Sequence, residues 1–192
     1  MGDAMGPADR LGGGMVGQSA AAERDPETDR RTTEQDQASE EIDRKEGRAD
    51  VVLATTTEAR ELLAAARRIA IVGASPDPVR PSNGVMSYLL AAGYTCVPIN
   101  PSVPEVLGQK AYPDLASAVS ADGRFDIVDV FRRPDAAPEV ARQAVETQAG
   151  ALWLQLGVVS WEAARLAAAA GLPVVMDRCT KIEHQAMRNA GR

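Results

Sequence analysis

The chain has 192 residues and a formal net charge of −6, and this charge lies at one end of it. Residues 1–50 contain 13 acidic and 7 basic side chains, whereas the remaining residues contain 14 of each. A neutral main portion lacks the clustered Lys and Arg that duplex nucleic acid requires, and no apolar run is long enough for a membrane span or signal peptide. We therefore expect a cytoplasmic protein that binds neither nucleic acid nor membranes.

Residues 1–54 are predicted to form a disordered acidic tail. Residues 23–50 contain only three apolar side chains, two alanines and Ile42. So little apolar surface cannot offset the entropy lost when a backbone becomes ordered. Residues 55–192 are predicted to form one domain, and the two cysteines of the chain are too few for a disulfide framework.

Five short apolar runs alternate with helical patterns along this domain. The predicted strands are residues 69–72, 95–99, 127–131, 151–155 and 173–176. The predicted helices are residues 59–68, 84–92, 113–119, 138–147, 161–170 and 181–189. Short, continuously apolar strands that alternate with helices are typical of a parallel sheet covered on both faces. The sequence therefore predicts a Rossmann-like, doubly wound α/β fold with a mostly parallel five-stranded sheet and helices on both faces.

Capping residues predict where three of these helices begin. Thr57 and Glu58 open the first helix, and Ser82 or Asn83 can cap the second. Ser160 is the predicted cap of the helix that follows the fourth strand.

The turn after the first strand, residues 73–84, is a candidate phosphate site. Gly73 permits a tight turn, and the next helix directs its free N–H groups back towards that turn. Ser75 and Ser82 add hydroxyl donors, and the Arg80 guanidinium can grip a phosphate. The turn alone also fits an ordinary strand-to-helix connection.

Two fingerprints of common nucleotide sites are missing from the sequence. The turn contains neither G-x-G-x-x-G nor the Gly-Lys-Ser/Thr of a P-loop. The second strand ends at Asn100 and Pro101, where an NAD site would usually place an acidic side chain. NAD binding and ATP hydrolysis are therefore disfavoured.

With these motifs in this order, the chain resembles the CoA-binding domain family from about residue 68 to residue 183. The resemblance rests on the order and spacing of motifs, which are Gly73-Ala74-Ser75, Arg80 with Ser82, Gly93-Tyr94, Pro98-Ile99-Asn100-Pro101, Gly108, Tyr112-Pro113-Asp114-Leu115, Asp126 to Arg132, Trp153 to Val158, and Val175 to Cys179. The chain is also similar, more distantly, to the first domain of the succinyl-CoA synthetase α subunit.

The resemblance implies a coenzyme A or acyl-CoA ligand along the carboxyl ends of the strands. It assigns the phosphates to Gly73, Ala74, Ser75 and Arg80, with Ser82 nearby, the adenosine border to Asn100 and Pro101, the flanks to Phe131, Arg132 and Arg133, and the pantetheine end to Gln155 and Gly157. Cys179 is a candidate contact for the pantetheine thiol, and an inert, partly buried thiol is its alternative.

Several residues near this site have structural alternatives. Arg132 and Arg133 can be a solvated pair of charges, and Trp153 is predicted to pack in the core. Asp129 lies within an apolar strand, so we expect it to accept hydrogen bonds from a neighbouring loop or to pair with an arginine. Cys96 is predicted to be a core residue, and His184, the one histidine of the chain, an incidental surface residue.

The sequence contains no recognisable catalytic set and no histidine and cysteine cluster with metal-ligand spacing. The first hypothesis is therefore a CoA or acyl-CoA binding protein without catalysis of its own. The alternatives are an enzyme or enzyme subunit that acts on a CoA thioester, and an NAD-type nucleotide binder with a degenerate fingerprint. A homodimer or a partner enzyme remains open.

Overall fold

A computed structural model describes residues 51–190, and its main element is one parallel sheet with the strand order β2-β1-β5-β6-β7. The strands are β1 (Arg68–Val72), β2 (Thr95–Ile99), β5 (Ile127–Val130), β6 (Leu152–Leu154) and β7 (Val174–Val175). The predicted fold class is confirmed, and each of the five predicted strands is present. Of the predicted tail, residues 1–50 lie outside the described residues.

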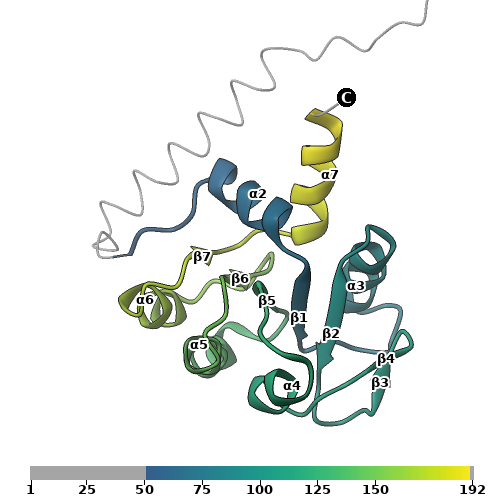
Figure 1. Ribbon diagram of the computed structural model, residues 1–192. Coiled ribbons are helices and arrows are strands. Elements are labelled where there is room, and N and C mark those ends of the chain that lie inside the picture. Colours follow the sequence, from purple (N-terminus) through teal and green to yellow (C-terminus); the bar gives the residue numbers. More distant parts are fainter. Residues whose placement is uncertain (1–50, 191–192) are drawn as a thin grey trace, which may run out of the picture. The chain divides into compact units, whose positions relative to one another are not determined.

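Helices cover both faces of the sheet (Figure 1). One face carries α2 (Thr56–Ala65), α3 (Pro81–Ala91) and α7 (Thr180–Ala190), and the other carries α4 (Leu115–Asp122), α5 (Ala137–Glu146) and α6 (Trp161–Ala169). Successive strand side chains point to opposite faces, so that β1 contributes Ile69 and Ile71 to the first core and Ala70 and Val72 to the second. The six predicted helices are present, with shifted ends.

The direction of winding reverses beside β1. From β1 the chain passes through α3 to β2 at one edge of the sheet, whereas from β5 it passes through α5 and α6 towards β7 at the other. The connections that leave β1 and β5 therefore turn to opposite faces. In doubly wound sheets such a reversal opens a crevice at the carboxyl ends of the strands, where ligands bind.

Two of the predicted helix starts are wrong, and local chemistry explains both. Helix α2 is capped by Thr55, whose hydroxyl accepts the Glu58 N–H while the Glu58 carboxylate accepts the Thr55 N–H at 2.8 Å. Helix α3 begins at Pro81, because proline suits the first helical position, and Ser82 therefore lies inside the first turn. The Ser160 cap is confirmed, since its hydroxyl accepts the N–H of Ala163.

A small hairpin between β2 and α4 was not predicted. It pairs β3 (Glu105–Val106) with the antiparallel β4 (Gln109–Lys110). The two residues of its turn, Leu107 and Gly108, have positive φ values of 51° and 75°. Strands of two residues leave no alternating pattern, and leucine replaces the Asn or Asp that usually signals such a turn.

The residues just before α2 pack on the domain. The N–H of Ala54 donates to the carbonyl of Val174 at 2.8 Å, along the outer side of β7. Val51 is 8% exposed and belongs to the core between the sheet and α4, α5 and α6. The ordered domain thus includes residues 51–54, which had been assigned to the tail.

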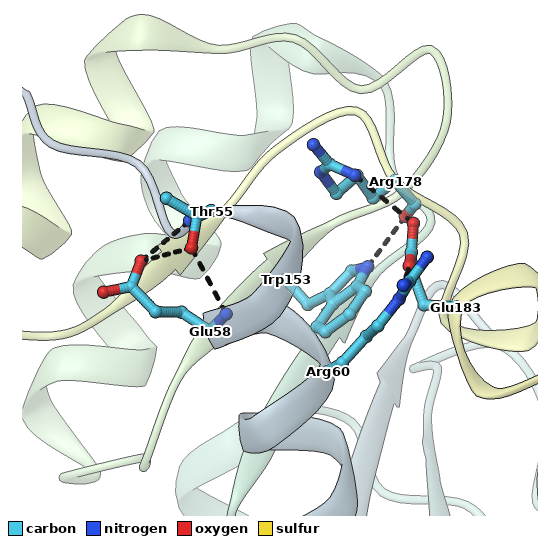
Figure 2. A network of polar contacts seen from close by, with 6 residues as sticks. All are labelled: Thr55, Glu58, Arg60, Trp153, Arg178 and Glu183. Carbon is cyan, nitrogen blue, oxygen red and sulfur yellow. Dashed lines mark hydrogen bonds and ion pairs between the residues drawn. The ribbon is translucent and has the colours of Figure 1, made fainter. Parts of the chain in front are cut away.

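A polar network joins α2 to the start of α7 (Figure 2). The Glu183 carboxylate accepts from Arg60 Nε at 2.9 Å and from an Arg178 guanidinium nitrogen at 3.3 Å. The indole N–H of the fully buried Trp153 donates to the Arg178 carbonyl at 2.7 Å. The predicted core role of Trp153 is confirmed, and its indole also holds the loop between β7 and α7.

We expect Glu183→Gln to lower the free energy of unfolding by about 1.5–3 kcal/mol, because a largely buried carboxylate loses its charge and one of the two oxygens that accept from arginines. Urea unfolding at pH 7 measures the change. Glu162→Gln is the matched control, because Glu162 is exposed and its ion pair with Arg142 is long at 3.8 Å. Equal effects of the two substitutions would contradict the structural role of Glu183.

His184 is a packing residue rather than the incidental surface residue that was predicted. Its Nδ1 lies 2.8 Å from the Tyr88 hydroxyl, and its ring meets the rings of Tyr88 and Tyr94 edge-on. Burial, with a smaller contribution from Arg188, lowers the pKa of His184. The histidine therefore joins α7 to α3 and belongs to the fold.

Candidate functional site

The β1 and β5 connections, which lie side by side at the carboxyl edge of the sheet, bring together two predicted parts of the site. Gly73 follows β1 with a φ of 85°, and a Cβ atom there would lie 3.1 Å from the Phe131 carbonyl oxygen and 3.0 Å from Arg132 Cδ. The Phe131 N–H donates to the Val72 carbonyl at 2.8 Å, so the two connections touch at their first residues. Both the conformation and the space require glycine at position 73.

Two asparagines fix the first residues of the turn after β1. Asn100 Nδ2 donates to the Ala74 carbonyl at 2.7 Å, and Asn83 Nδ2 donates to the Ser75 carbonyl at 2.9 Å. The Asn100 Oδ1 also accepts the Ser102 N–H at 2.8 Å. Asn100 thus connects two loops of the sheet edge, and the structure gives Asn83 a positioning role that the sequence analysis missed.

The backbone N–H groups at the start of this turn are engaged within the fold. The Gly73 N–H donates to the Ile99 carbonyl at 2.9 Å, and the Ala74 N–H donates to the Ile71 carbonyl at 3.3 Å. Ser82 is only 3% exposed, so a ligand could reach its hydroxyl only after a local movement. Contacts of a phosphate with these three residues stay predictions, and they would have to involve groups other than the two engaged amides.

Arg80 is the residue of the turn that is best placed to meet an anion. Its side chain is 71% exposed, and its guanidinium lies 4.0 Å from the Asp77 carboxylate, a distance at which an exposed pair contributes little. Asp77 instead shapes the turn, since its Oδ1 accepts the Val79 N–H at 2.9 Å and its own N–H donates to Ser75 Oγ at 3.2 Å. The Arg80 side chain therefore projects from a fixed turn into solvent.

The β5 connection also carries positive charge. Arg132 is exposed and its Cδ passes over Gly73, while Arg133 is exposed and pairs with Asp135 at 3.2 Å. Phe131 is half-buried against the core, and Pro101 is exposed beside Asn100. Guanidinium groups thus stand on both connections, which suits an anionic ligand.

A buried polar cluster closes the sheet edge beside β5 and β6. Gln155 Nε2 donates to both carboxylate oxygens of Asp129, at 2.9 and 3.0 Å, and lies 2.8 Å from Thr180 Oγ1. The Thr180 hydroxyl donates to Asp129 Oδ2 at 3.0 Å. The expectation that Asp129 accepts hydrogen bonds is confirmed, and Thr180 is a partner that sequence reasoning did not name.

Burial dominates the electrostatics of this cluster. It raises the pKa of the fully buried Asp129 to about 7, although the hydrogen bonds from Gln155 and Thr180 act in the opposite direction. Gln155 itself is buried, and its amide nitrogen serves the cluster. Its predicted contact with pantetheine stays a prediction, which would require its carbonyl end or its backbone.

The neighbouring loop positions Gly157, the other predicted contact at the pantetheine end. Gly157 is exposed with a φ of 78°, and its N–H donates to Asp177 Oδ1 at 2.7 Å. Asp177 has a φ of 57°, an uncommon conformation for a residue other than glycine. The loop after β6 and the loop after β7 are therefore locked together by Asp177.

The two cysteines occupy different environments. Cys96 is 1% exposed, and burial, with a smaller contribution from Asp129, raises the pKa of its thiol to about 12. Its predicted core role is confirmed. Cys179 is partly buried directly before α7, where its carbonyl accepts the Glu183 N–H at 3.0 Å, and its contact with a thiol ligand stays a prediction.

Within residues 51–190, no group of three or more His, Cys, Asp and Glu side chains has the geometry to hold a metal ion. No helix in this part of the chain is both long enough and apolar enough to cross a membrane.

The parallel doubly wound sheet defines a Rossmann-like α/β domain. A glycine turn lies at the reversal of winding, and exposed arginines stand on the two connections that meet there. Residues 67–185 match the family model described as "CoA binding domain". The chain belongs to that family.

Similar proteins are known from bacteria and archaea. The uncharacterized protein YneT of Bacillus subtilis (strain 168) is 42% identical over 127 residues, which span 66% of this chain and 92% of that protein. A hypothetical protein from Pyrococcus horikoshii OT3 is 39% identical with a TM-score of 0.65, over 69% of this chain and 92% of its own. The Thermus thermophilus protein cell-free ID.343 is 36% identical with a TM-score of 0.64, over 69% and 98% respectively.

Proposed function

We propose that this chain binds coenzyme A or an acyl-CoA along the carboxyl edge of its sheet and performs no catalysis of its own. The observation that carries the proposal is the contact of the β1 and β5 connections at Gly73 and Phe131, with Arg80 on the first connection and Arg132 and Arg133 on the second. A ligand that carries three phosphate groups suits such a set of guanidiniums. Membership of the CoA binding domain family supports the same ligand.

The chemistry of the site favours binding over catalysis. Asp129 has a pKa of about 7, which would suit proton transfer, but its carboxylate is fully buried beneath Gln155 and Thr180. A catalytic acid or base must come within hydrogen-bonding distance of the group it serves. We therefore assign Asp129 to the architecture of the edge.

The proposal is tested by titrating CoA into full-length protein that mass spectrometry has shown to be free of bound ligand. We expect saturable binding by calorimetry and a raised melting temperature, because a ligand at 100 times its Kd stabilises the folded state by about 2.7 kcal/mol. NAD⁺ serves as the competing nucleotide. Absence of both heat and melting shift at millimolar CoA would exclude the proposal, and turnover of an acyl-CoA would favour the enzyme alternative.

Arg80→Ala should raise the Kd for CoA about ten- to a hundredfold, because a charge-assisted hydrogen bond to phosphate is worth roughly 1.5–3 kcal/mol. The free energy of unfolding should change by less than about 0.5 kcal/mol, since the side chain is exposed and its one ion pair is long. Calorimetric titration and thermal melts give the two values.

Arg165→Ala is the matched control for this substitution. Arg165 is exposed on α6, so the control removes the same charge away from the carboxyl edge. A Kd for Arg80→Ala within twofold of the control would exclude Arg80 as a phosphate ligand.

A further inference from the structure

The loop that follows β6 presents two large apolar side chains to solvent. Leu156 is 56% exposed and Val159 is 44% exposed. Both belong to the connection that leaves the carboxyl end of β6 and reaches α6 at Trp161. They therefore lie at the same edge of the parallel sheet as the connections that leave β1 and β5.

The backbone of this loop is fixed on both sides of each exposed residue. The Gly157 N–H donates to Asp177 Oδ1 at 2.7 Å, and the Val158 N–H donates to the Gln155 carbonyl at 2.8 Å. The Ser160 N–H lies 3.3 Å from the Met176 sulfur. A single exposed apolar side chain is ordinary, whereas two that stand three residues apart on one fixed loop give the exposed side of that loop an apolar character.

Two polar side chains lie beside this surface. The Gln155 amide nitrogen is directed into the buried cluster with Asp129 and Thr180, whereas Asp177 is exposed and uses Oδ1 to accept the Gly157 N–H. The loop therefore offers a ligand the apolar side chains of Leu156 and Val159 beside one carboxylate. Such a surface selects an aliphatic group and disfavours an anionic one.

The strand order places this surface at a suitable separation from the proposed phosphate site. Strand β6 lies two positions from β1 in the sheet, which corresponds to about 10 Å at roughly 4.8 Å per strand. A CoA molecule whose phosphates lie at the β1 connection can extend its pantetheine arm along the edge towards β6. The sulfur end of the ligand, and any acyl group on it, then arrives at the loop after β6.

We propose that Leu156 and Val159 bind the acyl group of an acyl-CoA, and that the preferred acyl group is apolar and uncharged. This inference rests on the proposed CoA site and defines its ligand more closely. Because both ligands carry the pantetheine arm, it is the apolar loop that distinguishes an acyl-CoA from free CoA.

The test is a series of calorimetric titrations with CoA, acetyl-CoA, butyryl-CoA, hexanoyl-CoA and succinyl-CoA. In the wild-type protein the Kd should fall about three- to fourfold for each methylene group that the loop buries, so that butyryl-CoA binds roughly tenfold more tightly than acetyl-CoA. The double variant Leu156→Ser with Val159→Ser should bind every member of the series with the affinity of free CoA, which should stay within twofold of the wild-type value. Ile182→Ser is the control, because Ile182 is a similarly exposed apolar residue on α7.

The outcomes separate this inference from the proposed function. Binding of CoA with equal Kd values across the series, or tighter binding of succinyl-CoA than of butyryl-CoA, would overturn the acyl site while the CoA site stands. Failure of every ligand to bind would overturn the CoA site itself. If the double variant shifts the mass of the protein in solution and leaves the acyl series intact, the apolar surface contacts a second copy of the chain and the inference is wrong.

Discussion

Gly73→Ala should lower the free energy of unfolding by about 2–4 kcal/mol and raise the Kd for CoA at least tenfold. A φ of 85° is strained for any residue that carries a Cβ, at a cost of roughly 1–3 kcal/mol. The added atom would also lie 3.1 Å from a backbone oxygen of Phe131, which can yield only if the β5 connection moves. Because that connection carries Arg132 and Arg133 of the proposed site, CoA binding should be weakened together with stability.

Gly84→Ala is the matched control for this prediction. Gly84 lies in the first turn of α3, without a positive φ and with no atom within 4 Å of an added Cβ. Alanine there should stabilise the protein by about 0.5–1 kcal/mol, as expected for a helix position. Urea unfolding and CoA titration of both variants provide the comparison. Wild-type stability in Gly73→Ala would mean that the two connections can separate freely.

The second large effect is a pH dependence of stability that originates at Asp129. Its pKa is about 7 in the folded protein against an ordinary value of 3.8, so the folded state holds more protons between these two values. Stability from this group is therefore complete below pH 3.8 and is lost as the pH rises through 7. Between pH 5 and pH 7 the loss should be about 2 kcal/mol, because the slope is close to 1.36 kcal/mol per pH unit at pH 5 and falls as the carboxyl titrates near pH 7.

Asp129→Asn isolates this contribution, because the amide has nearly the same shape and does not titrate. Urea unfolding of both proteins at pH 5, 6, 7 and 8 should show the wild type losing stability relative to the variant as the pH rises. The lowered pKa of His184 has the opposite sign, since its contribution is lost as the pH falls below about 6.5, but it is common to both proteins and cancels. Parallel stability profiles for the two proteins would contradict the assignment to Asp129.

The sequence was sufficient to predict the layers of the fold. Each main strand is a short apolar run, and such runs are buried on both faces in the structure, as in Ile69 to Val72. The helix starts were harder, because several candidate caps lie close together. Thr55 and Thr57 are both possible caps for α2, since each is followed by residues that favour a helix. The reciprocal hydrogen bonds between Thr55 and Glu58 identify Thr55 as the cap.

The candidate site was predictable as a set of loops but not as a set of contacts. Gly73 and Arg132 were placed at one edge because each directly follows a predicted strand, and Arg80 because it lies in the turn that Gly73 begins. The structure brings Arg132 over Gly73, where its Cδ lies 3.0 Å from the position of an added Cβ. The buried cluster was not predictable in full, because Gln155 and Thr180 are 25 residues apart and meet only after α6 and β7 have folded back. Hydrogen bonds between side chains so far apart in the sequence depend on tertiary packing, which cannot be inferred from the local residue pattern.

The short stretch before α2 has a consequence for how the domain avoids association. Strand β7 is the last strand of the sheet, and its exposed side would otherwise offer unpaired backbone groups to another chain. The hydrogen bond from Ala54 to Val174 occupies one of these groups, and the burial of Val51 keeps the stretch in place. Residues 51–54 thus cover part of the free edge of β7. A chain shortened to begin at Thr55 would keep every strand but would leave this edge more open to pairing with another chain.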